Sequence, residues 1–296
     1  AWITLMWHMA LRLPWSWRLG PSNSSERAHV IEMLEQGEFP KHTLFCGDAG
    51  FIGYPLWSKI LDRGADFLVR VGSNASLLLE VADYRRDDDL VLCWPKVVMK
   101  SRQPPLRLRL VRVRIGKTRV WMLTSVTNPA QLTNQQIVQL YKMRWGIEIE
   151  FRGLKQTLDR AKLRSRNDRR LLAELHWSLM AMAIAELWAL KEQLSRRHAS
   201  PPLNRAPYSP VKRSLARTLR AIRTCLRNLP PVAEPEEDLS LALRIAVTDD
   251  YQRQASKRAR YRPPNPDKKP LGDPQLRRMT RSERKLLAQT ELKIAA

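Results

Sequence analysis

Four side chains that could act on a phosphodiester share one face of a predicted helix. They are Tyr141, Arg144, Glu148 and Lys155. At about 100° per residue, these positions fall within an arc of roughly 60° on a continuous helix. A carboxylate can bind a divalent metal ion and the flanking cations can bind phosphate, so the pattern favours phosphoryl transfer on a polyanion. The alternative is a solvated charged edge on an amphipathic helix.

One helix is expected to carry this strip, and a second long helix is expected to follow it. Thr133-x-x-Gln136 is a capping box that predicts the start of the first helix. Its apolar stripe, which would fix it to a core, consists of Leu140, Ile147, Phe151, Leu154 and Leu158. A second helix, over about 169–197, carries Leu, Met, Ala and Trp on most of its faces. We expect it to be central to the core.

The N-terminal part alternates predicted strands and helices. Apolar strands are expected in 2–18 around a turn at 11–14, then a helix from Ser24 or Ser25 to Leu34, a strand at 43–46 ending at Gly47-Asp48, a helix at 54–63 and a strand at 67–71. This β-β-α-β-α-β order predicts an α/β layer fold.

Residues 73–127 change to a pattern of strands and turns. The segment 106–115 alternates strictly and then slips phase at Leu110-Val111, which predicts a β-bulge. On either side of the slip, four arginines would line one polar surface: Arg107, Arg109, Arg112 and Arg114. That surface is either a solvated sheet face or a DNA contact.

Charge favours a nucleic acid as the partner. The 296 residues include 52 Lys and Arg against 29 Asp and Glu, a formal net charge of +23. A membrane surface is the competitor, but the longest apolar segment, 175–190, contains His176 and Glu186 and is expected to be a core helix. The opening residues lack a basic leader and a cleavage site, so no signal peptide is expected.

Cysteine and histidine usage points away from disulfides and zinc. Cys46, Cys93 and Cys225 are isolated and odd in number, which indicates buried thiols in a reducing cytoplasm. The five histidines show no metal-ligand spacing.

The C-terminal third is basic. Residues 212–228 predict a helix whose apolar stripe is Leu215, Leu219, Ile222 and Leu226. Another helix is expected at 238–251. The Pro-rich and basic composition of 252–296 predicts a disordered tail.

The sequence resembles DDE-type transposases of bacterial insertion sequences, specifically the insertion-sequence-four family with its Tyr-Arg-Glu-Lys signature. The resemblance is carried by the 141–155 strip with Trp145 and Phe151-Arg152, and by GPSNSSER at 20–27, GDAGF at 47–51 and KLRSRNDR at 162–169. It implies a ribonuclease-H-like α/β core, incomplete at its N-terminus, with a β-rich insertion and a helical, basic C-terminal region.

The resemblance also implies roles for individual residues. Asp48 would be the second catalytic acid and Glu148 the third, and both would bind Mg²⁺ or Mn²⁺. The residues expected to contact DNA are Tyr141, Arg144, Arg152, Lys155, Arg164 and Arg166. Trp94 would either stack on an extruded base or be a packed core residue, as its apolar surroundings favour.

The first acid of the family has no counterpart here. Residues 1–47 contain no Asp, and their acids are Glu26, Glu32, Glu35 and Glu38. We therefore expect an N-terminally truncated chain that is catalytically incomplete. The expected domains are 1–72 and 129–199 for the core, 73–128 for the insertion, 200–251 for the helical region and 252–296 for the tail.

The expected activity is metal-dependent cleavage and strand transfer at the ends of an insertion sequence. The partners would be double-stranded DNA and a second copy of the chain, at the nucleoid of a bacterial cytoplasm and without a membrane. Three alternatives stay open: an inactive DNA-binding remnant or regulator, an unrelated nuclease with the same core, and an RNA-binding module.

Overall fold

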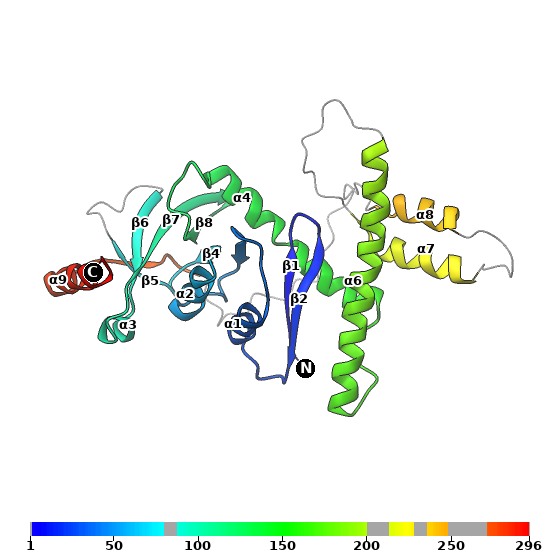
Figure 1. Ribbon diagram of the computed structural model, residues 1–296, viewed down its shortest axis with the longest axis horizontal. Helices are drawn as coiled ribbons and strands as arrows, with labels where there is room; N and C mark the ends of the chain where they lie inside the picture. Colours follow the sequence, from blue (N-terminus) through cyan, green and yellow to red (C-terminus); the bar gives the residue numbers. More distant parts are fainter. Residues whose placement is uncertain (1, 80–87, 200–212, 228–235, 248–270, 296) are drawn as a thin grey trace. The chain divides into compact units, whose positions relative to one another are not determined.

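The computed structural model describes residues 2–79, 88–199, 213–227, 236–247 and 271–295 (Figure 1). The chain forms two compact units, and each is built from two separate stretches of sequence. Unit one comprises Ala1–Ser22 and Trp145–Tyr261, and unit two comprises Asn23–Arg144 and Arg262–Ala296.

Unit one combines a β-hairpin with helices. Its elements are β1 (Trp2–His8), β2 (Leu13–Gly20), α5 (Gly146–Arg152), the π-helix η1 (Gly153–Thr157), α6 (Asp168–Ala199), α7 (Leu215–Arg227) and α8 (Glu236–Arg244). The hairpin confirms the two strands predicted around the 11–14 turn, and its register shifts between Met6 and Trp7. Leu154, Leu179 and Met182 form a buried cluster to which Trp17 and Leu215 add partly buried surface.

The expectation that α6 is central to the core holds for one side of the helix only. Leu175, Leu179 and Met182 are buried, but Trp177 is 69% exposed and Ile184 is 60% exposed. Composition could not reveal this, because the apolar residues lie on both sides of the helix. The segment 168–195 is long and apolar enough to cross a membrane, with only a third of its apolar window buried. A single helix of this kind is weak evidence for a membrane span.

Two smaller expectations about unit one also need correction. The helix predicted at 212–228 is confirmed as α7, but Leu226 of its supposed apolar stripe is 64% exposed. The helix predicted at 238–251 is α8, which ends at Arg244. Residues 248–251 lie outside the described residues.

Unit two is built around a mixed sheet with the strand order β3-β4-β8-β7-β6-β5-β9. Its strands are β3 (Leu44–Gly47), β4 (Asp66–Val71), β5 (Ser76–Leu79), β6 (Asp88–Cys93), β7 (Leu106–Ile115), β8 (Thr118–Thr124) and β9 (Gln275–Arg278). Its helices are α1 (Glu26–Gln36), α2 (Tyr54–Asp62), α3 (Lys96–Lys100), α4 (Asn134–Met143) and α9 (Arg281–Ala295). Strands β3 and β4 pair in parallel, as do β5 and β9, and the other pairs are antiparallel.

Local signals set most helix ends as expected. Ser25 caps α1 through the Ala28 N–H, Thr133 and Gln136 form the predicted capping box of α4, and Gly64 follows α2 with φ of 65°. Trp94 is buried and its indole donates to the Gln103 carbonyl at 2.9 Å, which confirms that it is a packed core residue.

The predicted bulge in β7 is wrong. Its pairing with β8 is continuous from Arg109↔Thr124 to Ile115↔Thr118. Without a phase slip, Arg107 and Arg109 point to one face and Arg112 and Arg114 to the other, so they do not line a common polar surface. The apolar alternation changes phase in the sequence because the side chains in the middle of β7 are buried on both faces of the sheet.

Each of three arginines in β7 also has a partner within the protein. Arg109 is 1% exposed and donates to the Leu132 carbonyl and to Asn134 Oδ1, each at 2.9 Å. The guanidinium of Arg112 lies 5.2 Å from the centre of the Trp121 ring. Arg107 forms an ion pair with Glu291.

The predicted disorder of 252–296 is wrong for 271–295. Strand β9 pairs in parallel with β5 at the sheet edge, and α9 follows it. Tertiary hydrogen bonds overcome the unfavourable composition: Gln275 N donates to the Ala75 carbonyl at 2.8 Å and the Trp121 indole donates to Asp273 Oδ1 at 2.8 Å. Residues 252–270 lie outside the described residues.

The fold class is therefore α/β with a mixed sheet, which is consistent with the expected core. Strands of the 73–127 segment belong to the same sheet as β3 and β4. The detailed ribonuclease-H-like assignment and the expected domain boundaries stay predictions.

Candidate functional site

Asp48 directly follows β3 in unit two. Its Oδ1 accepts a hydrogen bond from Gly50 N at 2.8 Å, and its carbonyl accepts one from Phe51 N at 3.2 Å. Gly47 allows this close turn, because a Cβ there would approach the side chains of Phe51 and Val69 within 3.0–3.2 Å. The strand and the turn thus hold the carboxylate at the end of the parallel β3–β4 pair.

Glu26, in the first turn of α1, lies near Asp48. Partial burial raises the pKa of the Glu26 carboxyl, the negative charge of Asp48 raises it further, and His29 lowers it. Glu26 was not predicted to be a site residue, because only the packing of α1 brings it to the end of β3. Among the residues that the structure describes, no three His, Cys, Asp or Glu side chains gather as a metal site.

Tyr141 and Arg144 lie at the C-terminal end of α4, also in unit two. The Arg144 guanidinium lies 5.2 Å from the centre of the Tyr141 ring, which packs against the core cluster of Leu68, Val111 and Met122. Burial raises the pKa of the Cys46 thiol to about 12, and the positive charge of Arg144 acts against this rise. Arg144 is therefore close to Cys46 in β3. Cys46 lies two residues before Asp48.

The continuous helix predicted for the 141–155 strip is wrong. Helix α4 ends at Met143, a turn follows, and α5 begins at Gly146. Residues 153–157 form a π-helix, in which Leu158 N donates to the Gly153 carbonyl at 3.0 Å. Arg144 and Trp145 keep right-handed helical dihedrals, so the break there is one of hydrogen bonding. The π-helix departs from the 3.6-residue period, so the 60° arc of a regular helix does not extend to Lys155.

The remaining expected site residues belong to unit one. Glu148 is half-buried in the first turn of α5, and its N–H donates to the Trp145 carbonyl at 3.1 Å. The other four are exposed cations: Arg152, Lys155, Arg164 and Arg166. The structure therefore places Asp48, Tyr141 and Arg144 in unit two, whereas Glu148 belongs to unit one.

Packing fixes the direction of Glu148. Trp7 of β1 donates its indole N–H to Glu150 Oε1 at 3.0 Å, and a Cβ on Gly146 would lie 1.9 Å from Trp7 Cη2. Residues 146 and 150 thus pack on Trp7. Glu148, two positions from each along an α-helix, points to the other side.

Buried acids in unit one were not recognised in the sequence. Burial raises the pKa of Glu150 to about 7, with opposing effects of the Trp7 hydrogen bond and of Arg213. Burial and the nearby Glu150 raise the pKa of Glu186 to about 8, while Arg213 lowers it. Arg213 also donates to the Leu11 carbonyl at 2.6 Å. Local spacing gave no signal for this cluster, since its members lie on three separate stretches of sequence.

Comparisons with known proteins identify the family to which the chain belongs. Residues 6–184 match the family described as "Transposase DDE domain". The chain is 31% identical over 155 residues to a protein of Sinorhizobium fredii (strain NBRC 101917 / NGR234) described as "Putative transposase y4zB". The match covers 48% of this chain and 41% of that relative, so the chain spans about two fifths of the relative's length.

Proposed function

Because the chain belongs to the family of transposase DDE domains, we propose that it serves DNA-mediated transposition of a bacterial insertion sequence of the insertion-sequence-four family. The proposed chemistry is cleavage and strand transfer at the ends of the element. One observation supports it most directly: Cys46, two residues before Asp48, packs against the same core cluster as Tyr141 of α4, the helix that ends just before Arg144. A carboxylate for metal binding and a cation for phosphate thus follow the ends of two elements that share this cluster.

The residues around Asp48 suit a hard divalent cation, and we propose Mg²⁺ or Mn²⁺. Carboxylate oxygens are the ligands such ions prefer. The negative charge of Asp48 raises the pKa of Glu26, and a bound cation would relieve this repulsion. Asp48 and Glu148 would hold the metal. When bound, divalent ions activate the attacking oxygen and stabilise the leaving oxygen of a phosphodiester.

The protein's own side chains would orient the DNA. Arg144 and Lys155 would each contact a phosphate near the scissile bond, with Tyr141 supporting Arg144 through its ring. The exposed cations Arg152, Arg164 and Arg166 would extend the contact along the backbone. We further propose a homodimer on DNA, in the bacterial cytoplasm at the nucleoid.

A DNA-binding remnant or regulator without catalysis is the second candidate. Its support is the formal net charge of +23, which favours DNA binding whether or not the chain cleaves DNA. Incubation of the 296-residue chain with Mg²⁺ or Mn²⁺ and DNA bearing the element's ends separates the two candidates. End-specific nicking by this chain would support the proposed cleavage chemistry and exclude the remnant, whereas intact DNA would favour the remnant.

The proposed roles are tested by DNA affinity across a salt series. Arg144→Ala and Lys155→Ala should each weaken binding and lower the log–log salt slope by about 0.9, the contribution of one phosphate contact on duplex DNA. Glu148→Gln removes a negative charge near the backbone, so DNA binding should be equal or tighter while Mn²⁺ affinity falls. Lys191→Ala, an exposed cation on α6, is the control. Identical behaviour of all four variants would contradict the assigned roles.

A further inference from the structure

The first two turns of α9 carry a cationic face. It is formed by Arg281, Arg284 and Lys285, all of which are exposed. Positions i, i+3 and i+4 lie on one side of a helix, about 5–6 Å apart. Leu286 and Leu287 are half-buried and Thr290 is 5% exposed, so the helix packs through its other side.

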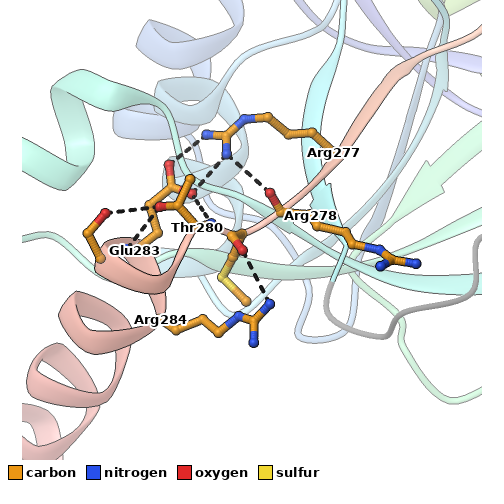
Figure 2. Close-up of polar contacts among 7 residues, drawn as sticks. Arg277, Arg278, Thr280, Glu283 and Arg284 are labelled. Atoms are coloured by element: carbon orange, nitrogen blue, oxygen red, sulfur yellow. Dashed lines mark hydrogen bonds and ion pairs between the residues drawn. The ribbon is translucent and has the colours of Figure 1, made fainter.

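The acids of the same segment already have partners elsewhere. Both oxygens of Glu283 accept hydrogen bonds from Arg277, at 2.7 and 2.8 Å, and one also accepts from Thr280 N at 2.8 Å (Figure 2). Asp273 accepts from the Trp121 indole, and Glu291 pairs with Arg107. The three acids of residues 271–291 are thus engaged with partners outside the α9 cationic face.

The position of these cations on the helix is electrostatically unfavourable. The N-terminal turns of a helix carry a partial positive charge, which disfavours Arg and Lys there. Glu283 has the sign that suits this end, but its carboxylate is bound by Arg277; this bond is the main reason that its pKa is lowered to about 2. A bound anion would offset the remaining positive charge at the start of α9.

A fixed scaffold presents the face. Strand β9, which precedes α9, pairs with β5 over the four residues from Gln275 to Arg278. Thr280 and Glu283 form a reciprocal capping box, and the ion pair of Glu291 with Arg107 connects the second half of the helix to β7. The cations therefore lie on a helix that is fixed at its start and in its second half.

We propose that the α9 cationic face binds backbone phosphates of DNA. The inference rests on the proposed function for the identity of the polyanion, and it adds a surface outside the Tyr141–Lys155 region. A row of three cations matches the regular negative charge of a DNA strand, and such contacts fix position without reading sequence.

The test compares two triple variants of the full chain on duplex DNA across a salt series. Arg281→Gln with Arg284→Gln and Lys285→Gln removes the face but keeps residues that favour a helix. The log–log salt slope should fall by up to about 2.7, which is three contacts of about 0.9 each. The control removes the same charge from three exposed cations of unit two that lie outside α9: Lys41→Gln, Lys117→Gln and Arg119→Gln. The log–log salt slope of this control variant should change by less than about 0.9, the contribution of one phosphate contact.

Thermal melts followed by circular dichroism verify folding. The melting temperature of the α9 variant should be unchanged or higher, because cations are removed from the positive end of a helix. A parent chain that binds DNA while the α9 variant keeps the parent's slope would overturn this inference and leave the proposed function standing. Equal losses in both variants would also overturn it, since they indicate diffuse attraction. A parent chain that does not bind DNA would overturn both.

Discussion

Gly146 of α5 packs against the ring of Trp7 in β1, and a methyl group at residue 146 has no space. An ideal Cβ there would lie 1.9 Å from Cη2, 2.4 Å from Cζ3 and 2.5 Å from Cζ2 of the Trp7 ring. Such distances are far inside van der Waals contact. The indole cannot rotate away at no cost, because its N–H donates to Glu150 Oε1 at 3.0 Å.

Gly146→Ala should therefore destabilise the protein. Overpacking of this kind costs about 1–3 kcal/mol, and the rigid ring places the expected value at the upper end. In a background that carries Trp7→Ala, the same change should have the opposite sign. With the ring absent, only the helix propensity remains, and it favours Ala over Gly by up to about 1 kcal/mol.

The assay is urea unfolding of the full chain, followed by far-UV circular dichroism, for the four members of this double-mutant cycle. The loss of the Glu150 hydrogen bond is common to both members that lack Trp7, so it cancels in the coupling energy. Gly272→Ala is the control, because a Cβ there makes ordinary contact with Ser73 at 3.5 Å. Equal effects of Gly146→Ala with and without the Trp7 ring would refute the reasoning.

Three further predictions concern buried or paired charges. Glu186→Gln should raise the melting temperature at pH 8 and flatten the dependence of that temperature on pH. The pKa of Glu186 is raised from 4.5 to about 8 in the folded state, so the folded protein retains a proton that the unfolded chain releases. The parent therefore loses stability as the pH rises from 4.5 to 8, and the variant does not. Glu283→Ala should lower the free energy of unfolding in urea at pH 7 by about 1 kcal/mol, which is typical of a lost helix cap. The pKa of Glu283 is lowered to about 2, so the difference in unfolding free energy between variant and parent should vanish as the pH falls from 4.5 towards 2. Arg109→Met should cost about 1–3 kcal/mol in the same assay, because the Leu132 carbonyl and Asn134 lose a buried donor; an unchanged midpoint would contradict the buried role of Arg109.

Features encoded in a few neighbouring residues could be predicted from the sequence. The cap of α1 at Ser25, the capping box of α4 and the end of β3 just before Asp48 each depend on local hydrogen bonds or on a short apolar run. The position of Trp94 in the core was the favoured one of its two interpretations, and the structure confirms it. In these places, local preference and tertiary structure agree.

Features that depend on distant partners could not be predicted. Arg109 was placed on a polar face by its spacing, but Leu132, in the loop before α4, and Asn134, the first residue of α4, supply the acceptors that let it be buried. Glu150 and Glu186 belong to different helices, and Arg213 approaches them from a third stretch of sequence. Periodicity in any one segment contains no information about such meetings.

The interruption of the 141–155 strip shows how far a motif constrains geometry. Spacing alone placed Tyr141, Arg144, Glu148 and Lys155 on one face, on the assumption of a regular helix. The structure instead ends α4 at Met143 and adds one residue to the helical turn from Gly153 to Leu158. A π-helix changes the angle between successive side chains, and π-helical turns are frequent at functional sites. The residue types of the strip therefore indicate the chemistry, whereas the directions of the side chains are set by the packing of Gly146 and Glu150 on Trp7 and by the contact of Arg144 with Tyr141.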